Sequence, residues 1–125
     1  MYKIMLADDE GIVIDSLKFI IEKEFKDTCE VQYAKTGRSV IELAESFRPD
    51  VAVMDIQMPE MDGYEATKRI RNLDDARADI PIVAMTANAF VEDVQAVKNA
   101  GMNDHLAKPL EINKVIHTIG KYLNK

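Results

Sequence analysis

A short apolar run that ends in a carboxylate, Val51-Ala52-Val53-Met54-Asp55, constrains the fold of this chain more than any other stretch. The run is too short for a helix and shows no polar alternation, so it predicts a strand buried on both faces, as in a parallel sheet. The loop that follows carries Pro59 and Gly63 and gives way to a helical pattern near Tyr64. We therefore expect Asp55 at the carboxyl edge of a parallel sheet, where such sheets hold their functional sites.

The rest of the chain alternates strand and helix patterns in the same way. The predicted strands are residues 2–7, 29–34, 51–55, 80–86 and 105–107. The predicted helices are one that ends near residue 25, then 39–47, 64–73, 88–100 and 111–123, with a turn at Thr36-Gly37. Five strands alternating with five helices predict an α/β fold in which right-handed crossovers place helices on both faces of a parallel, doubly wound sheet. At 125 residues, the chain is expected to be one domain spanning 1–125.

Composition excludes several classes of function. The 16 basic and 22 acidic residues leave a net charge of −6, which argues against direct binding of nucleic acid, because such binding rests on neutralising phosphates. No apolar run approaches the roughly 18 residues of a membrane span, and the first residues do not resemble a signal peptide. A cytoplasmic protein that does not contact the membrane is expected. Cys29 has no partner for a disulfide and is interpreted as a small core residue.

Helical periodicity predicts which side chains face the core and which do not. On the first helix the inward residues are Val13, Ile14, Leu17, Ile20, Ile21 and Phe25, and on the last they are Ile112, Val115, Ile116, Ile119, Tyr122 and Leu123. Ile12 and Phe19 fall on the opposite side of the first helix, where charge is expected. They are either isolated exposed apolar residues, which are common, or a docking site for a partner.

Five polar residues stand at or just after predicted strand ends, and the fold alone would gather them in one crevice. They are Asp8, Asp9, Asp55, Thr86 and Lys108. Two carboxylates about 4 Å apart repel by roughly 4 kcal/mol at an effective dielectric of 20, so a cation is expected among them, and hard oxygen ligands suit Mg²⁺. With an ammonium and a hydroxyl beside it, Asp55 is a candidate nucleophile for phosphoryl transfer. Each residue could also have a purely structural role: Asp9 could cap a helix, for example, and Asp55 could stabilise a turn.

Four motifs together carry a resemblance to a known family. They are Ala7-Asp8-Asp9, the stretch from Met54-Asp55-Ile56 through Met61-Asp62-Gly63, Ala84-Met85-Thr86-Ala87, and Ala107-Lys108-Pro109. Together they resemble the receiver domain of bacterial two-component response regulators, over essentially the whole chain. The resemblance implies a flavodoxin-like sheet with strand order 2-1-3-4-5.

The resemblance also implies roles for the acids. Asp55 would accept a phosphoryl group from a phosphohistidine donor, so that the domain catalyses its own phosphorylation and dephosphorylation without being a separate turnover enzyme. Asp9, Asp55 and the backbone carbonyl of Gln57 would bind Mg²⁺, with Mn²⁺ as an alternative ion, and Asp8 would assist through water.

The remaining motif residues would hold the phosphoryl group or change conformation when it is present. By the resemblance, Thr86 and Lys108 contact it, and the Lys108-Pro109 bond is cis. The family couples the threonine to an aromatic residue three positions before the lysine, where this chain has His105. Thr86 and His105 are therefore the expected switch residues, and the face formed by the fourth helix, fifth strand and fifth helix would change its partner preference.

Two positions near the site bear on how long the phosphoryl group lasts. Gln57 and Asn88 each lie two residues past a site residue, where the family tunes water access. Neither is an acid or base placed to activate water strongly, so we expect a lifetime of minutes or longer.

The subfamily and the partners follow from the same resemblance. The beginning of the chain resembles receivers that precede DNA-binding output domains, whereas the second half is more similar to receivers of hybrid histidine kinases, which suggests a mixed ancestry or a recombined chain. A stand-alone or an excised receiver is expected, as a monomer or a phosphorylation-dependent dimer. The expected partners are a sensor histidine kinase or a histidine phosphotransfer protein, docking near Ile12 and Phe19, and a downstream effector or output domain outside this chain.

Three other functions can be compared with these residues. A phosphatase of the haloacid dehalogenase type needs a second Asp two residues after the first, where this chain has Gln57. A flavodoxin-like cofactor binder needs a phosphate loop after the first strand, where Asp8-Asp9-Glu10 would repel phosphate. A phosphorylation-silent interaction module of the same fold stays open as the alternative function, although the intact acids, Thr86 and Lys108 argue against it.

Overall fold

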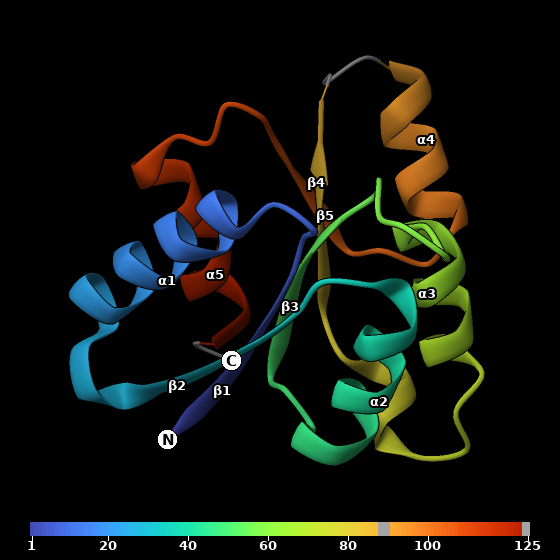
Figure 1. The fold of residues 1–125 in the computed structure, drawn as a ribbon, viewed down its shortest axis with the longest axis horizontal. Helices are drawn as coiled ribbons and strands as arrows, with labels where there is room; N and C mark the ends of the chain where they lie inside the picture. Colours follow the sequence, from blue (N-terminus) through green and yellow to red (C-terminus); the bar gives the residue numbers. More distant parts are fainter. Residues whose placement is uncertain (88–90, 124–125) are drawn as a thin grey trace.

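A parallel five-stranded sheet forms the centre of the computed structural model, which describes residues 1–87 and 91–123 (Figure 1). The strands are β1 (Tyr2–Ala7), β2 (Cys29–Ala34), β3 (Val51–Asp55), β4 (Ile82–Thr86) and β5 (Asp104–Ala107). Their order in the sheet is β2-β1-β3-β4-β5 and every neighbouring pair is parallel. The predicted fold class and strand order are therefore confirmed.

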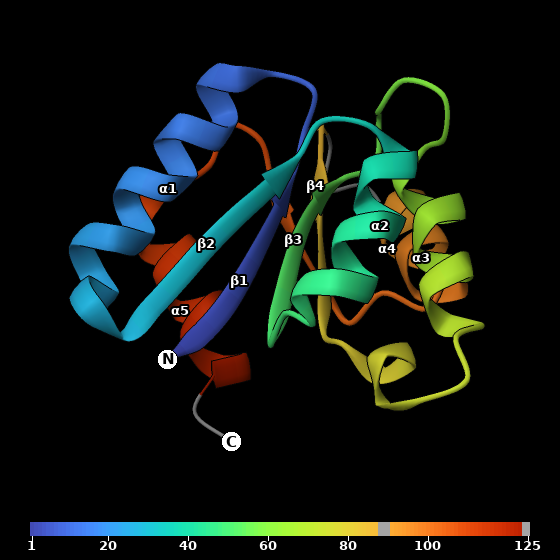
Figure 2. The same ribbon diagram turned by 60° about the horizontal axis from the view of Figure 1, so that its bottom comes forward.

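Helices cover both faces of the sheet. They are α1 (Gly11–Phe25), α2 (Gly37–Phe47), α3 (Gly63–Arg71), α4 (Val91–Asn99) and α5 (Ile112–Leu123). The helices α1 and α5 lie on one face, and α2, α3 and α4 lie on the other (Figure 2). Two short 3₁₀ helices that the sequence did not predict, Lys26–Thr28 and Ala76–Asp79, complete the connections before β2 and β4.

The central strand β3 is buried along its whole length, as its apolar sequence predicts. Val51 and Val53 pack into the cluster under α1 and α5, while Ala52 and Met54 pack into the cluster under α2, α3 and α4. Parallel pairing with β1, from Ile4 opposite Val51 to Ala7 opposite Met54, brings the carboxyl ends of these two strands side by side. The residues that follow β1 therefore lie next to Asp55.

Two helices begin earlier than the sequence predicted. The helix α2 starts at Gly37 rather than at residue 39, because Thr36 is its N-cap and accepts a hydrogen bond from the Ser39 N–H at 3.1 Å. The predicted turn at Thr36-Gly37 is thus the start of the helix. The helix α3 spans Gly63–Arg71 rather than 64–73, and Asp62 caps it by accepting from the Glu65 N–H.

The later elements also differ from prediction by a few residues. The strand β4 begins at Ile82 rather than at residue 80, because the Ile80 N–H donates to the Arg77 carbonyl and closes the 3₁₀ helix. The strand β5 begins one residue earlier than predicted and α5 one residue later. Of the predicted helix 88–100, the structure describes Val91–Asn99, and residues 88–90 lie outside the described part of the chain.

One predicted core residue is wrong. Ile112 was expected on the inward face of α5 but is 59% exposed. It is the first residue of that helix, and the buried part of the helix begins at Val115, three residues later. Cys29 is partly buried and packs at the edge of the α1 and α5 cluster, where burial raises the pKa of its thiol. No helix in the described ranges is long and apolar enough to span a membrane.

Candidate functional site

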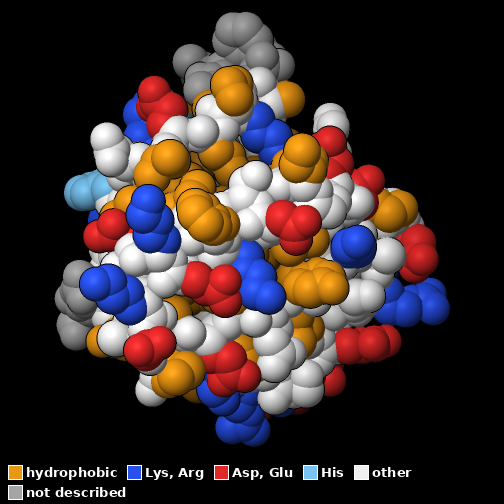
Figure 3. Space-filling view, turned by 60° about the vertical axis from the view of Figure 1, so that its left-hand side comes forward, with side chains coloured by type: hydrophobic (Ala, Val, Ile, Leu, Met, Phe, Trp, Pro, Cys, Tyr) orange, Lys and Arg blue, Asp and Glu red, His pale blue; other side chains and the backbone are white. Residues whose placement is uncertain are grey.

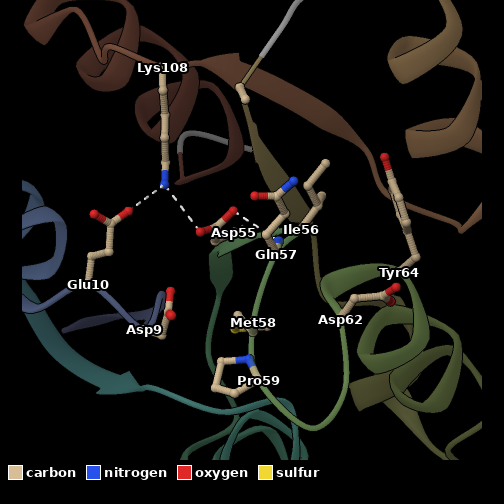
Figure 4. Close-up of a pocket in the computed structure, with 11 residues that line it drawn as sticks. Asp9, Glu10, Asp55, Ile56, Gln57, Met58, Pro59, Asp62, Tyr64 and Lys108 are labelled. Atoms are coloured by element: carbon tan, nitrogen blue, oxygen red, sulfur yellow. Dashed lines mark hydrogen bonds and ion pairs between the residues drawn. The ribbon is translucent and has the colours of Figure 1, made fainter.

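Three carboxylates meet at the carboxyl edge of the sheet. Asp8 and Asp9 follow β1, and Asp55 is the last residue of β3. One carboxylate oxygen from each lies within 4.8 Å of the others, which makes a cluster of hard oxygen donors. The cluster opens into a cleft of about 850 Å³ (Figure 4).

Lys108, which follows β5, brings a positive charge to these acids. Its Nζ lies 3.1 Å from Asp8 Oδ2. It also lies 3.2 Å from Asp55 Oδ2 and 3.7 Å from Glu10 Oε1 (Figure 4). The Lys108 N–H donates to the Thr86 carbonyl at 2.7 Å, and the Lys108-Pro109 peptide bond is cis, as the resemblance implied. The ammonium group therefore partly neutralises the cluster.

Burial and pairing act against each other in this site. Burial raises the pKa of Asp8, which is fully buried, although hydrogen bonds from the Glu10 N–H and from Lys108 oppose that rise. For Lys108, burial lowers the pKa, but hydrogen bonds to Asp8 and Asp55 outweigh it and leave the pKa raised. Lys108 is thus charged at neutral pH and holds the two acids together.

Thr86, the last residue of β4, carries an unusual hydroxyl. The side chain is 1% exposed, and its Oγ1 has no hydrogen-bond partner among the residues that the structure describes. A buried hydroxyl without a partner costs roughly 1–3 kcal/mol, so such groups call for a functional explanation. A group that arrives at Asp55 with acceptor oxygens would satisfy it.

The loop between β3 and α3, residues 56–62, is held by close backbone contacts. The Gln57 N–H donates to Asp55 Oδ1 at 3.0 Å, and the Gly63 N–H donates to the Ile56 carbonyl at 3.0 Å. A Cβ at Gly63 would lie 2.5 Å from the Asp55 carbonyl oxygen, so only glycine lets α3 begin this close to the end of β3. The backbone at Gln57 is therefore placed beside the carboxylate.

The donor set fits a hard divalent cation. Asp9 is exposed and forms no hydrogen bond or ion pair with the described residues, while Asp8 and Asp55 are buried and paired with Lys108. Carboxylate and carbonyl oxygens with room for water are the ligands that Mg²⁺ prefers. This combination of one free and two paired carboxylates could hold such an ion.

The other predicted site residues lie outside this cluster. His105 is partly buried in the middle of β5, opposite Ala84, and its side chain is not in the acid cluster. Ile12 and Phe19 are 75% and 66% exposed on α1, as their position predicted, and Lys23 lies over the Phe19 ring. Exposure alone does not choose between an ordinary surface and a docking site.

Glu10 is a site residue that sequence reasoning missed. It lines the cleft and approaches Lys108, but it was considered only as a residue that would repel phosphate. A signal was present, because Glu10 occupies the N-cap of α1, where Ser, Thr, Asp or Asn is preferred.

A parallel 2-1-3-4-5 sheet that gathers acids, a lysine and a threonine at its carboxyl edge defines the receiver class of signalling domains. The chain belongs to the response regulator receiver domain family, whose model matches residues 4–120.

Similar proteins agree with this family. The polar-differentiation response regulator DivK of Brucella anthropi is 32% identical over 120 residues, covering 96% of this chain and 94% of its own length. The receiver domain of a sensor histidine kinase from Pseudomonas aeruginosa, solved with a magnesium ion coordinated in its active site cleft, is 29% identical, with a TM-score of 0.87 over 99% of this chain and 98% of its own. The chemotaxis response regulator CheY4 of Vibrio cholerae is 26% identical, with a TM-score of 0.86 over 98% of both chains.

Proposed function

We propose that this receiver is a phosphoacceptor in a two-component or phosphorelay system, and that Asp55 takes a phosphoryl group from a phosphohistidine. The observation that carries the proposal is the position of Asp55, with its carboxylate beside Asp8, Asp9 and Lys108 at one edge of the sheet. The unpaired hydroxyl of Thr86 at the same edge supports it. A phosphorylation-silent interaction module is not favoured, because such a module would not need these carboxylates, the ammonium or the hydroxyl.

The transfer itself is a displacement at phosphorus. An Asp55 carboxylate oxygen forms the new P–O bond while the bond from phosphorus to the donor imidazole nitrogen breaks, and the imidazole leaves with the electron pair and takes up a proton. Lys108 then exchanges its contact with Asp55 for a phosphoryl oxygen, and Thr86 donates its hydroxyl hydrogen to another.

Asp9, Asp55 and the Gln57 carbonyl would hold Mg²⁺, or Mn²⁺ in its place, with Asp8 contributing through water. The bound ion supplies positive charge that offsets the repulsion between the carboxylates and the incoming phosphoryl oxygens. The magnesium reported in the cleft of the similar Pseudomonas receiver domain supports this assignment.

The proposal extends to partners and to the response. A sensor histidine kinase or a histidine phosphotransfer protein, in the cytoplasm, would dock on α1 at Ile12 and Phe19, which are exposed on the helix that follows Glu10 of the cleft. Phosphorylation would shift Thr86 and His105 and alter the α4, β5 and α5 face for a downstream effector or output domain. A monomer, or a dimer formed on phosphorylation, fits this scheme.

The phosphoryl group is expected to last minutes or longer. Gln57 lines the cleft next to Asp55 but is neither an acid nor a base, so it does not activate water strongly. Following the loss of the added mass after the donor is removed would test this, and complete loss within seconds would contradict it.

The central experiment is intact-mass measurement after incubation with Mg²⁺ and acetyl phosphate. Wild-type protein should gain a single labile phosphoryl group, Asp55→Asn should gain none, and Asp62→Asn should behave as wild type, because Asp62 lines the same cleft but caps α3. If wild type gains nothing, the experiment is repeated with a phosphorylated histidine phosphotransfer domain. Failure with both donors would favour the silent module.

A further inference from the structure

Glu10 directs its carboxylate into the cleft instead of capping its own helix. It occupies the N-cap position of α1, yet its side chain forms no capping hydrogen bond. Its Oε1 instead lies 3.7 Å from Lys108 Nζ (Figure 4). A residue type that is poor for a cap and that points away from the helix indicates a role other than helix stability.

The contact with Lys108 does not explain Glu10 as a stabilising residue. The Glu10 side chain is 60% exposed and the 3.7 Å separation is longer than the 3.1 and 3.2 Å that join Lys108 to Asp8 and Asp55. Exposed ion pairs of this kind contribute little to folding. Lys108 already has two closer partners, so Glu10 mainly adds one more negative charge at the mouth of the cleft.

The negative charge of Glu10 acts on any phosphodonor that enters the cleft. Glu10 adds a further carboxylate to the three of the acid cluster, beside the single ammonium of Lys108. A small anionic donor must cross this negative mouth, and it has few contacts elsewhere to offset the repulsion. A donor protein that carries the phosphohistidine can offset this repulsion with contacts outside the cleft.

We propose that Glu10 is a specificity-determining residue, which slows phosphorylation of Asp55 by small anionic phosphodonors and so favours a phosphohistidine presented by a protein. This inference rests on the proposed phosphoacceptor function. It uses a repulsive group to exclude the wrong donor, which is a general route to specificity.

The test compares two small donors on the Glu10→Gln variant at saturating Mg²⁺. Acetyl phosphate is a dianion at neutral pH and phosphoramidate carries one negative charge fewer, so charge removal should help acetyl phosphate more. We expect the rate constant for labelling of Asp55 to rise about threefold with acetyl phosphate and less than twofold with phosphoramidate. The gain should shrink in 0.5 M salt because the charges are exposed and therefore screened.

Two further variants separate local charge from other effects. Glu10→Asp keeps the charge and should stay slow, whereas Glu24→Gln removes an exposed charge near the far end of α1 and should leave the rates unchanged. Mg²⁺ affinity of each variant, measured by calorimetry, identifies the concentration at which the ion is saturating, so that a change in metal binding is not read as a change in donor selection.

Equal acceleration with both donors, a gain that persists in high salt, or no acceleration would each overturn the assignment of Glu10. These results leave the phosphoacceptor function intact as long as wild type is labelled on Asp55. A wild-type protein and a Glu10→Gln variant that both stay unlabelled with the two small donors and with a phosphorylated histidine phosphotransfer domain would overturn both proposals.

Discussion

The hydroxyl of Thr86 is buried at the end of β4 without a hydrogen-bond partner among the described residues. Replacing it with a methyl group of the same shape removes the cost of that unsatisfied group. Thr86→Val should therefore raise the free energy of unfolding by about 1 kcal/mol, measured by urea denaturation without Mg²⁺ or phosphodonor. Thr86→Ser keeps the hydroxyl and should show no such gain, and a Thr86→Val protein less stable than wild type would contradict the prediction.

At the level of single residues, the sequence placed the acids at one sheet edge but not their surroundings. Asp8 and Asp9 are neighbours, yet Asp8 is fully buried against Lys108 while Asp9 is exposed. The difference depends on how the chain turns as it leaves β1, which residue types and spacing do not specify. The role of Glu10 was not predicted either, because its contact with Lys108 joins residues that lie far apart in the chain.

Among the elements, α2 and the β3–α3 loop touch so closely that only glycine fits. A Cβ built at Gly37 would overlap the Cβ and carbonyl oxygen of Met61. Gly37→Ala should push the loop away from α2, lower the free energy of unfolding by about 1–3 kcal/mol and weaken Mg²⁺ binding, because Gln57 lies in the same loop. Urea denaturation and calorimetric Mg²⁺ titration would measure the two effects.

The control for this prediction is Gly11→Ala, because a Cβ at Gly11 would meet only the end of the Lys35 side chain, at 3.7 Å. It should leave both properties close to wild type. Mg²⁺ affinity unchanged in a destabilised Gly37→Ala protein would show that the loop position does not depend on this contact.

The strand β5 is tied to α5 by Asp104. Burial raises the pKa of Asp104, but hydrogen bonds from Lys121, the His105 N–H and Tyr122 outweigh it, so the pKa lies below its usual value. Because the folded-state pKa is below the unfolded one, the ionised group stabilises the fold above about pH 4, and this stabilisation is lost as the pH falls from there through the folded-state pKa.

Asp104→Asn should accordingly lower the free energy of unfolding at pH 7 by about 0.5–1 kcal/mol, since Lys121 is half exposed and the pair is partly screened. The difference from wild type should shrink at pH 3. Urea denaturation at the two pH values would test this, with Asp27→Asn on the 3₁₀ helix before β2 as an exposed control. An equal difference at both pH values would exclude the ionised carboxylate as its source.

Element types were predictable, and their ends were less so. The bounds of β1, β2 and β3 were predicted correctly: β3 is an apolar run, β1 is mostly apolar, and β2 alternates apolar and polar residues up to Ala34. The start of β4 was predicted wrongly because residue 80 is apolar and fits a strand. Its backbone hydrogen bond to the Arg77 carbonyl instead makes it the C-cap of the 3₁₀ helix. The pattern of apolar and polar residues therefore predicts which elements form. Where an element begins or ends can depend on hydrogen bonds in the connecting segment, which that pattern does not show.

For the whole molecule, the α1 side is the surface on which a donor protein is expected. Ile12 and Phe19 protrude from α1, and Figure 3, which brings this side forward, shows apolar side chains among acidic and basic ones. Ile12→Ala removes an apolar contact without adding charge to the cleft. It should slow transfer from a histidine phosphotransfer protein about tenfold, since burying an isoleucine side chain contributes roughly 1.5–3 kcal/mol, and leave folding stability unchanged.

Labelling by acetyl phosphate should be unaffected in the same Ile12→Ala protein, which separates docking from chemistry. Tyr2→Ala is the matched control, because Tyr2 is an exposed aromatic residue at the opposite, amino edge of the sheet. Equal transfer rates for wild type and Ile12→Ala would remove Ile12 from the docking site.

The pairing of β1 with β3 has a consequence for how this protein can be studied. Asp9 and Asp55 are brought together only when these two central strands lie in register, so neither an unfolded chain nor one with a slipped strand possesses the reactive cluster. The fraction of molecules that can take up a phosphoryl group therefore equals the fraction that is correctly folded. A brief exposure to donor during refolding would record, by mass alone, when the centre of the sheet has formed.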